Sequence, residues 1–150
     1  MSAVEQLQQS LAPKWRLFAV TVPLSLLFGE LFYGTLGSMD AFEWSTLAAP
    51  MMLTVVVLIF IMRLLQSFWL VPRRLNAPLD EAAVARRLRN AGRFLLFAWA
   101  FSALTALFGM VMFLSQAPRF YGYSLLAIAI VYLMIYYPRP SLLQALGSDE

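Results

Sequence analysis

Cysteine and histidine are both absent from the 150-residue chain, and charged residues make up only 13% of it. The missing thiols and imidazoles exclude disulfides, thiol chemistry, haem ligation by histidine and the common zinc sites. Soluble domains carry about 25% charged residues, so the low charge content also argues against a soluble domain. Apolar residues instead account for 61% of the chain. This composition is typical of a small polytopic membrane protein that forms a single domain.

Four apolar stretches are long enough to cross the hydrocarbon core of a bilayer, which takes about 20 helical residues. They cover approximately residues 17–36, 47–71, 94–114 and 120–137. Helices are expected because lipid cannot satisfy exposed backbone groups and the alternation of a barrel is absent. The first stretch is longer than a signal-peptide core and contains Glu30, so we expect it to be retained. The sequence therefore predicts an all-α fold over residues 1–150, with four transmembrane helices in an up-down bundle.

The basic residues predict how this bundle is oriented. One group precedes the first stretch, separates the second from the third, or follows the fourth: Lys14, Arg16, Arg73, Arg74, Arg86, Arg87, Arg89, Arg93 and Arg139. Only Arg119 lies on the other side, where the first loop carries Asp40 and Glu43. By the positive-inside rule, both termini and the central loop are expected in the cytoplasm.

Aromatic residues gather near the ends of the predicted spans, and we interpret them as an interfacial belt. The residues are Trp15, Trp44, Trp69, Phe120, Tyr121, Tyr123, Tyr136 and Tyr137. Amphipathic rings favour the headgroup region, so a belt is a simpler interpretation than a binding site for a cation or a carbohydrate.

The polar segment between the second and third spans predicts a short amphipathic cytoplasmic helix that runs into the third span. Val84, Leu88 and Ala91 form an apolar stripe, and Pro78 lies near the expected helix start. The arginines of the segment, with Arg73 and Arg74, are explained by the positive-inside effect and ordinary lipid contacts. Specific binding of anionic lipid headgroups or of an acidic partner subunit are the open alternatives. Nucleic acid is not expected as a partner, because no recognition motif is present.

Two ionisable residues fall within the predicted spans, and such residues are costly to bury in lipid. Glu30 is expected in the outer half of the bilayer and Arg63 in the inner half, followed by Gln66. Each can carry a proton or an ion, or can reach an interface and serve structure alone. In an upright antiparallel pair of helices, Glu30 and Arg63 would differ in depth by ~12 Å, so direct pairing is not expected.

A stripe of small residues runs along the third span. Ala98, Ser102, Ala106 and Gly109 recur at helical spacing, and small residues let membrane helices approach closely. We interpret the stripe as a packing seam within the bundle, with contact to another subunit as the alternative.

The segment Ala103-Leu104-Thr105-Ala106-Leu107-Phe108-Gly109, with the closing Tyr137-Pro138-Arg139-Pro140, resembles small uncharacterised four-helix bacterial inner-membrane proteins. The resemblance implies the fold and the membrane but no activity. The chain is also similar in character to the proteolipid subunit of rotary ATPases. That family depends on a carboxylate within a membrane helix of each hairpin, and the second, third and fourth spans have none.

No catalytic motif is present, and without histidine the usual general base is missing, so no enzymatic activity, cofactor or metal is expected. The leading hypothesis is a non-catalytic accessory or assembly subunit of a larger inner-membrane complex. It would contact the lipid bilayer, its anionic headgroups and either other subunits or a second copy. The alternative is a small oligomeric channel or transporter that uses Glu30 and Arg63.

Overall fold

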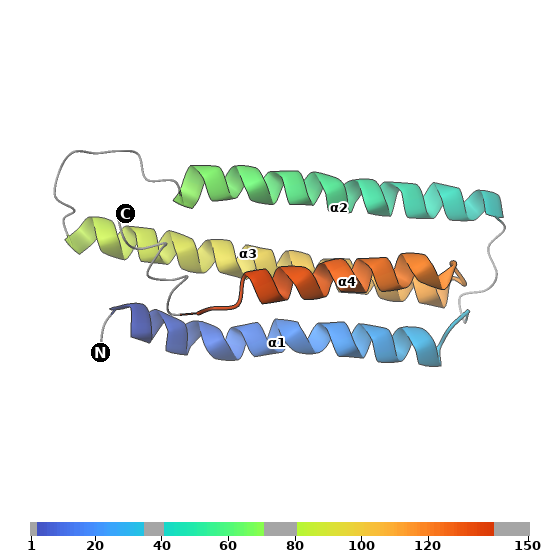
Figure 1. Ribbon diagram of the computed structural model, residues 1–150, viewed down its shortest axis with the longest axis horizontal. Helices are drawn as coiled ribbons and strands as arrows, with labels where there is room; N and C mark the ends of the chain where they lie inside the picture. Colours follow the sequence, from blue (N-terminus) through green and yellow to red (C-terminus); the bar gives the residue numbers. More distant parts are fainter. Residues whose placement is uncertain (1–2, 35–40, 71–80, 140–150) are drawn as a thin grey trace.

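The computed structural model describes residues 3–34, 41–70 and 81–139, and four helices account for nearly all of them (Figure 1). The helices are α1 (Ala3–Leu31), α2 (Ala41–Leu70), α3 (Glu81–Leu114) and α4 (Arg119–Ile135). Successive helices run in opposite directions (Figure 1). The predicted all-α fold is therefore confirmed.

Three of the helices are long and apolar enough to cross a membrane. The qualifying segments are Glu5–Leu31 in α1, Ala48–Gln66 in α2 and Ala85–Leu114 in α3, with mean hydropathies of 1.3, 2.3 and 2.0. α4 is apolar as well, but its 17 residues give a length of only about 26 Å. Three of the expected spans are thus present as candidates, and the fourth crossing remains a prediction.

α3 is the central helix of the molecule. Its most extensive contacts are with α1 and α4, whereas α2 packs less extensively against it, on the side opposite to α1 (Figure 1). Val55 of α2 also shares a core cluster with Leu125 of α4. Half of the spanning window of α3 is buried, compared with 17% for the windows of α1 and α2. Trp99 and Phe94, both on α3, are the largest side chains that are fully buried.

The Phe113 ring shows how closely three helices approach one another. It lies between Gly29 on α1 and Gly122 on α4, and a Cβ atom added to either glycine would fall 2.7 Å from it. Any side chain at these two positions would therefore displace a fully buried ring, so glycine is what allows α1, α3 and α4 to pack at this level.

α1 begins at Ala3, well before the start near residue 17 that the apolar pattern predicts. Its first turns are polar and contain Pro13, so hydropathy alone does not predict a helix there. The structure supplies the reason for the extension, because Leu11 is buried and Leu7 packs on the same core cluster as Leu95 of α3. Tertiary packing of one apolar stripe thus overrides the polar composition and the proline.

The predicted amphipathic surface helix is not a separate element. Residues 81–93 are the first turns of α3, which continues without a break for 34 residues, or about 51 Å. Leu88 and Ala91 are buried in the bundle rather than laid on a lipid surface. Gly92 faces Leu7 of α1, which shows that the extensions of the two helices pack on each other.

Several residues of the predicted aromatic belt bind the bundle together instead. The Trp15 indole donates to the Leu133 carbonyl at 3.2 Å, and the Trp99 indole donates to the Tyr136 carbonyl at 2.9 Å. Carbonyls at a helix end lack partners within the helix, so these two indoles cap the end of α4. Tyr136 is also half-buried against Phe94.

Of the other belt residues, four are exposed and two have side chains that lie outside the described residues. Phe120, Tyr121, Tyr123 and Tyr137 are exposed, which fits an interfacial position. The side chains of Trp44 and Trp69 lie outside the described residues.

Candidate functional site

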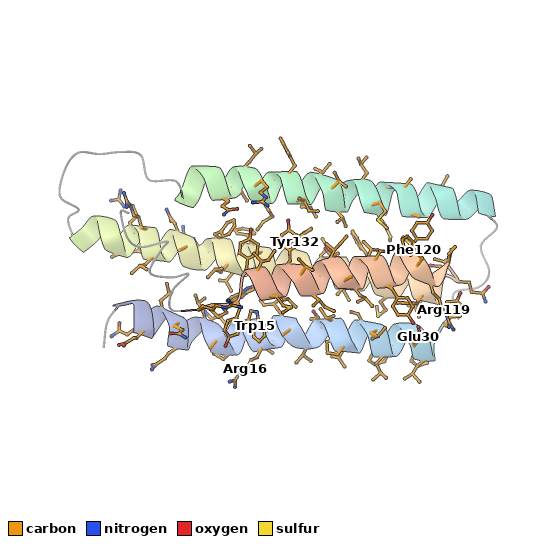
Figure 2. All side chains as sticks on the ribbon, viewed as in Figure 1. Trp15, Arg16, Glu30, Arg119, Phe120 and Tyr132 are labelled. Atoms are coloured by element: carbon orange, nitrogen blue, oxygen red, sulfur yellow. The ribbon has the colours of Figure 1, made fainter. Side chains whose placement is uncertain are left out.

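Glu30, one residue before the end of α1, is a charged residue in an apolar helix, and its carboxylate contacts side chains of another helix. Its Oε1 accepts a hydrogen bond from the Tyr123 hydroxyl at 2.5 Å, and its Oε2 lies 3.8 Å from Nη2 of Arg119. Both partners belong to the first turns of α4, and Figure 2 shows Glu30 and Arg119 at the same end of the bundle. A charge that is costly in lipid is therefore compensated by a donor and a cation.

Further contacts surround this ion pair and close the end of the bundle. The Arg119 guanidinium lies 4.9 Å from the centre of the Tyr33 ring, and the Tyr33 hydroxyl donates to the Ala117 carbonyl at 3.2 Å. The backbone N–H of Gly34 donates to the Phe113 carbonyl, with a φ of 77° that favours glycine. The end of α1 is thereby attached to the turn between α3 and α4.

The chemistry available at this cluster is limited. The side chains of Arg119 and Glu30 are 57% and 33% exposed, so the pair lies at the edge of the bundle rather than in a closed cavity. Among the described residues, no group of three or more acidic, histidine or cysteine side chains could hold a metal ion. The geometry suits a structural closure of three helices better than a catalytic or ion-binding centre.

The structure separates Arg63 from Glu30. Arg63 is exposed, and its neighbour Met62 packs with Phe94 and Ala98 in the first half of α3. Gly29, the neighbour of Glu30, instead lies against Phe113 near the other end of α3. At 1.5 Å per residue, these levels differ by roughly 25 Å along α3. The ~12 Å offset inferred from the sequence is too small, because α1 ends at Leu31 and Glu30 therefore lies at the end of its helix.

Gln66 lies one turn from Met62 along α2. Its side-chain Oε1 is buried, and it has no hydrogen-bond partner among the residues whose side chains are described. A buried acceptor without a donor costs about 1–3 kcal/mol.

The arginines of the predicted cytoplasmic segment fall into two groups on α3. Arg86, Arg89 and Arg93 are exposed, form no ion pair within the described part of the chain, and share one face of the helix. Arg87 is half-buried and turned away from that face. Arg73 and Arg74 lie outside the described residues.

The small-residue stripe of α3 faces the interior of the chain. All four of its members, Ala98, Ser102, Ala106 and Gly109, are buried. The Ser102 hydroxyl donates to the Ala129 carbonyl of α4 at 2.7 Å, and a Cβ atom on Gly109 would lie 3.1 Å from the Gly122 carbonyl oxygen. Most of the seam is thus occupied by α4 of the same chain, which leaves little of it for another subunit.

Sequence reasoning selected Glu30 but missed its partners. Tyr123 lies 93 residues away along the chain, and nothing in the pattern around it distinguishes it from the other interfacial tyrosines. The caps formed by Trp15 and Trp99 were missed for the same reason, because each joins positions that are distant in sequence.

Comparison with family models, with curated proteins and with solved structures finds no match for this chain. The function is therefore argued from the geometry of the chain itself.

Proposed function

We propose that this protein is an integral membrane protein that acts by contact, as an accessory or assembly subunit of a larger inner-membrane complex. The observation that carries the proposal is the outward face of α2. Leu53, Val57, Phe60 and Leu64 recur at i, i+4, i+7 and i+11, and they are 64%, 47%, 65% and 43% exposed. α2 has one extensive helix neighbour, whereas α3 has three.

The position of α2 supports a helical partner in the membrane. Membrane helices gain their packing energy from close contact with other helices, since lipid tails are as apolar as the side chains that they cover. A partner helix laid along this outward face would give α2 a second neighbour and would leave the closed group of α1, α3 and α4 unchanged.

The interior of the bundle supports contact over transport. Trp99, Phe94 and Phe113 are fully buried and fill the space around α3. Glu30 and Arg63, the two charges that a transport pathway would use, lie at different levels and on different sides of this apolar core. Among the described residues, a single copy thus offers no continuous polar path, and the channel hypothesis loses its main support.

The orientation is part of the proposal: α4 completes a fourth crossing, and both chain ends lie in the cytoplasm. Its 17 residues are at the lower limit of about 17–25 for a membrane span. Arg86, Arg89 and Arg93 lie in the first half of α3, toward the end that the positive-inside rule assigns to the cytoplasm.

Photocrosslinking in native membranes tests the contact role. A photoreactive phenylalanine analogue replaces Phe60 on the outward face of α2, and the same replacement at Phe28 on α1, also exposed, is the matched control. We expect Phe60 to give a discrete adduct with one other membrane subunit, and the reverse purification of that subunit to recover this chain. Adducts with lipid alone, or the same protein adducts from both positions, would overturn the proposal.

A further inference from the structure

An open apolar groove lies between α2 and α3, on one side of the molecule. Leu58, Ile61 and Leu65 of α2 form one wall, and Phe97, Ala100 and Leu104 of α3 form the other. Its volume of about 330 Å³ is within the range of about 300–1,000 Å³ that is usual for small-molecule sites. In a bilayer this groove opens onto lipid, so its natural occupant is an acyl chain.

The face of α3 that forms the groove continues into a row of cations. At 3.6 residues per turn, positions 86, 89 and 93 fall within about 55° of the line through positions 97, 100 and 104. The first three positions are Arg86, Arg89 and Arg93, all exposed, and no ion pair of theirs is present in the described part of the chain. One continuous stripe of α3 is therefore cationic in its first half and apolar in its second.

The dimensions of this stripe fit one leaflet of a bilayer. Arg93 and Leu104 are separated by about 16 Å along the helix, which is close to half of the ~30 Å hydrocarbon core. An acyl chain that starts beside Arg93 would reach the middle of the membrane at the end of the groove. The cations would then lie at the level of the headgroups, where a phosphate is found.

Comparison with a second groove shows why the α2–α3 groove is the better candidate for a lipid site. Trp15, Val22 and Ile130 are among the residues that line a groove of about 360 Å³ between α1 and α4. The helix positions that extend it beyond Trp15 are Leu11 and Ala12, neither of which is charged. Similar apolar volume is present there without a row of cations.

We propose that the α2–α3 groove binds one acyl chain of an anionic phospholipid, with the lipid phosphate held by Arg93 and Arg89. The site rests on the proposed residence in a membrane, but it does not need the partner subunit. Loss of lipid binding in the purified protein therefore leaves the contact role untouched, and the absence of a partner leaves the lipid site untouched.

Native mass spectrometry of the purified full-length protein tests the site. The probes are phosphatidylglycerol, which is anionic, and phosphatidylcholine, which is zwitterionic, with identical acyl chains. We expect the first bound lipid to be phosphatidylglycerol, and we expect Arg93→Gln and Arg89→Gln each to weaken its binding about fivefold. Lys14→Gln removes one positive charge from an exposed position on α1 and is expected to leave the binding unchanged.

A second variant tests the groove itself. Ala100→Phe fills the α3 wall without changing the charge, and it is expected to weaken phosphatidylglycerol binding while the helical content measured by circular dichroism stays the same. Equal binding of the two lipids, or an equal loss with Lys14→Gln, would overturn the proposal. Unchanged binding in Ala100→Phe would also overturn it, because the arginines would then hold headgroups without the groove.

Discussion

Glu30 shows how one residue sets the chemistry at the end of the bundle. Its carboxylate accepts a hydrogen bond from the Tyr123 hydroxyl and lies 3.8 Å from the Arg119 guanidinium. The same contacts join α1 to α4. In the contact hypothesis Glu30 is therefore a structural residue.

The substitution Glu30→Gln separates the two hypotheses. The neutral amide accepts a weaker hydrogen bond from Tyr123 and loses its attraction to Arg119, so the midpoint of unfolding in detergent is expected to fall. Tyr123→Phe is expected to lower it as well, and the double variant should lose less than the sum of the two. Proton flux into proteoliposomes, followed with an enclosed pH-sensitive dye, is expected to be the same for parent and variant. A flux that disappears with Glu30→Gln would instead support transport.

At the scale of residues, the candidate side chains could be chosen from the sequence, but the side chains that they contact could not. The rarity of charge in apolar stretches was enough to select Glu30 and Arg63. Their neighbours depend on the register between helices, which no local pattern encodes. The stripe from Ala98 to Gly109 was also visible in the sequence, whereas the carbonyls of Ala129 and Gly122 that it meets were not.

At the scale of elements, the apolar parts of the helices could be predicted, but the polar extensions at the starts of α1 and α3 could not. α2 spans Ala41–Leu70 and α3 ends at Leu114, in agreement with hydropathy for the apolar parts. α1 and α3 extend beyond their apolar parts because Leu7 and Leu11 of one pack with Gly92 and Leu95 of the other. Such mutual stabilisation is a property of the pair, so hydropathy applied to either segment alone misses it.

The packing of α3 on α4 predicts a sharp difference between two glycines of α3. At Gly109 even a Cβ atom would lie 3.1 Å from the Gly122 carbonyl oxygen, so Gly109→Leu is expected to cost about 1–3 kcal/mol of stability. At Gly92 the nearest atom is the Leu7 Cδ1 at 3.5 Å, an ordinary contact, so Gly92→Ala is expected to be neutral or slightly stabilising. Unfolding of both variants by denaturing detergent gives the comparison.

Equal stability of the two glycine variants would mean that the seam does not pack on α4. If Gly109→Leu instead left the monomer stable and disrupted only a larger assembly, the seam would be an interface between subunits.

The whole molecule is asymmetric. α1, α3 and α4 form a closed group, and α2 is attached to one side of it through α3 (Figure 1). Such an arrangement leaves the outer face of α2 and the α2–α3 groove as the two surfaces on which other molecules can act, one for a protein helix and one for a lipid. Neither surface was evident from the sequence, because each depends on which helices are neighbours.

Cysteine labelling tests the orientation of the molecule. The parent chain has no cysteine, so single-cysteine variants are free of background. Pro118→Cys places a thiol in the exposed turn between α3 and α4, and Ser10→Cys places one on the exposed surface of α1 near its start. A membrane-impermeant maleimide is expected to label Pro118→Cys in intact cells and Ser10→Cys only after permeabilisation. The reverse pattern would invert the proposed orientation.

The most direct test of the contact role is the mass of the protein released from its own membrane without prior separation from its neighbours. Native mass spectrometry is expected to show the 17.0 kDa chain within a heavier species that contains at least one different protein subunit. The chain recovered at its own mass, or with lipid alone, would contradict the proposal that it works as a subunit of a larger complex.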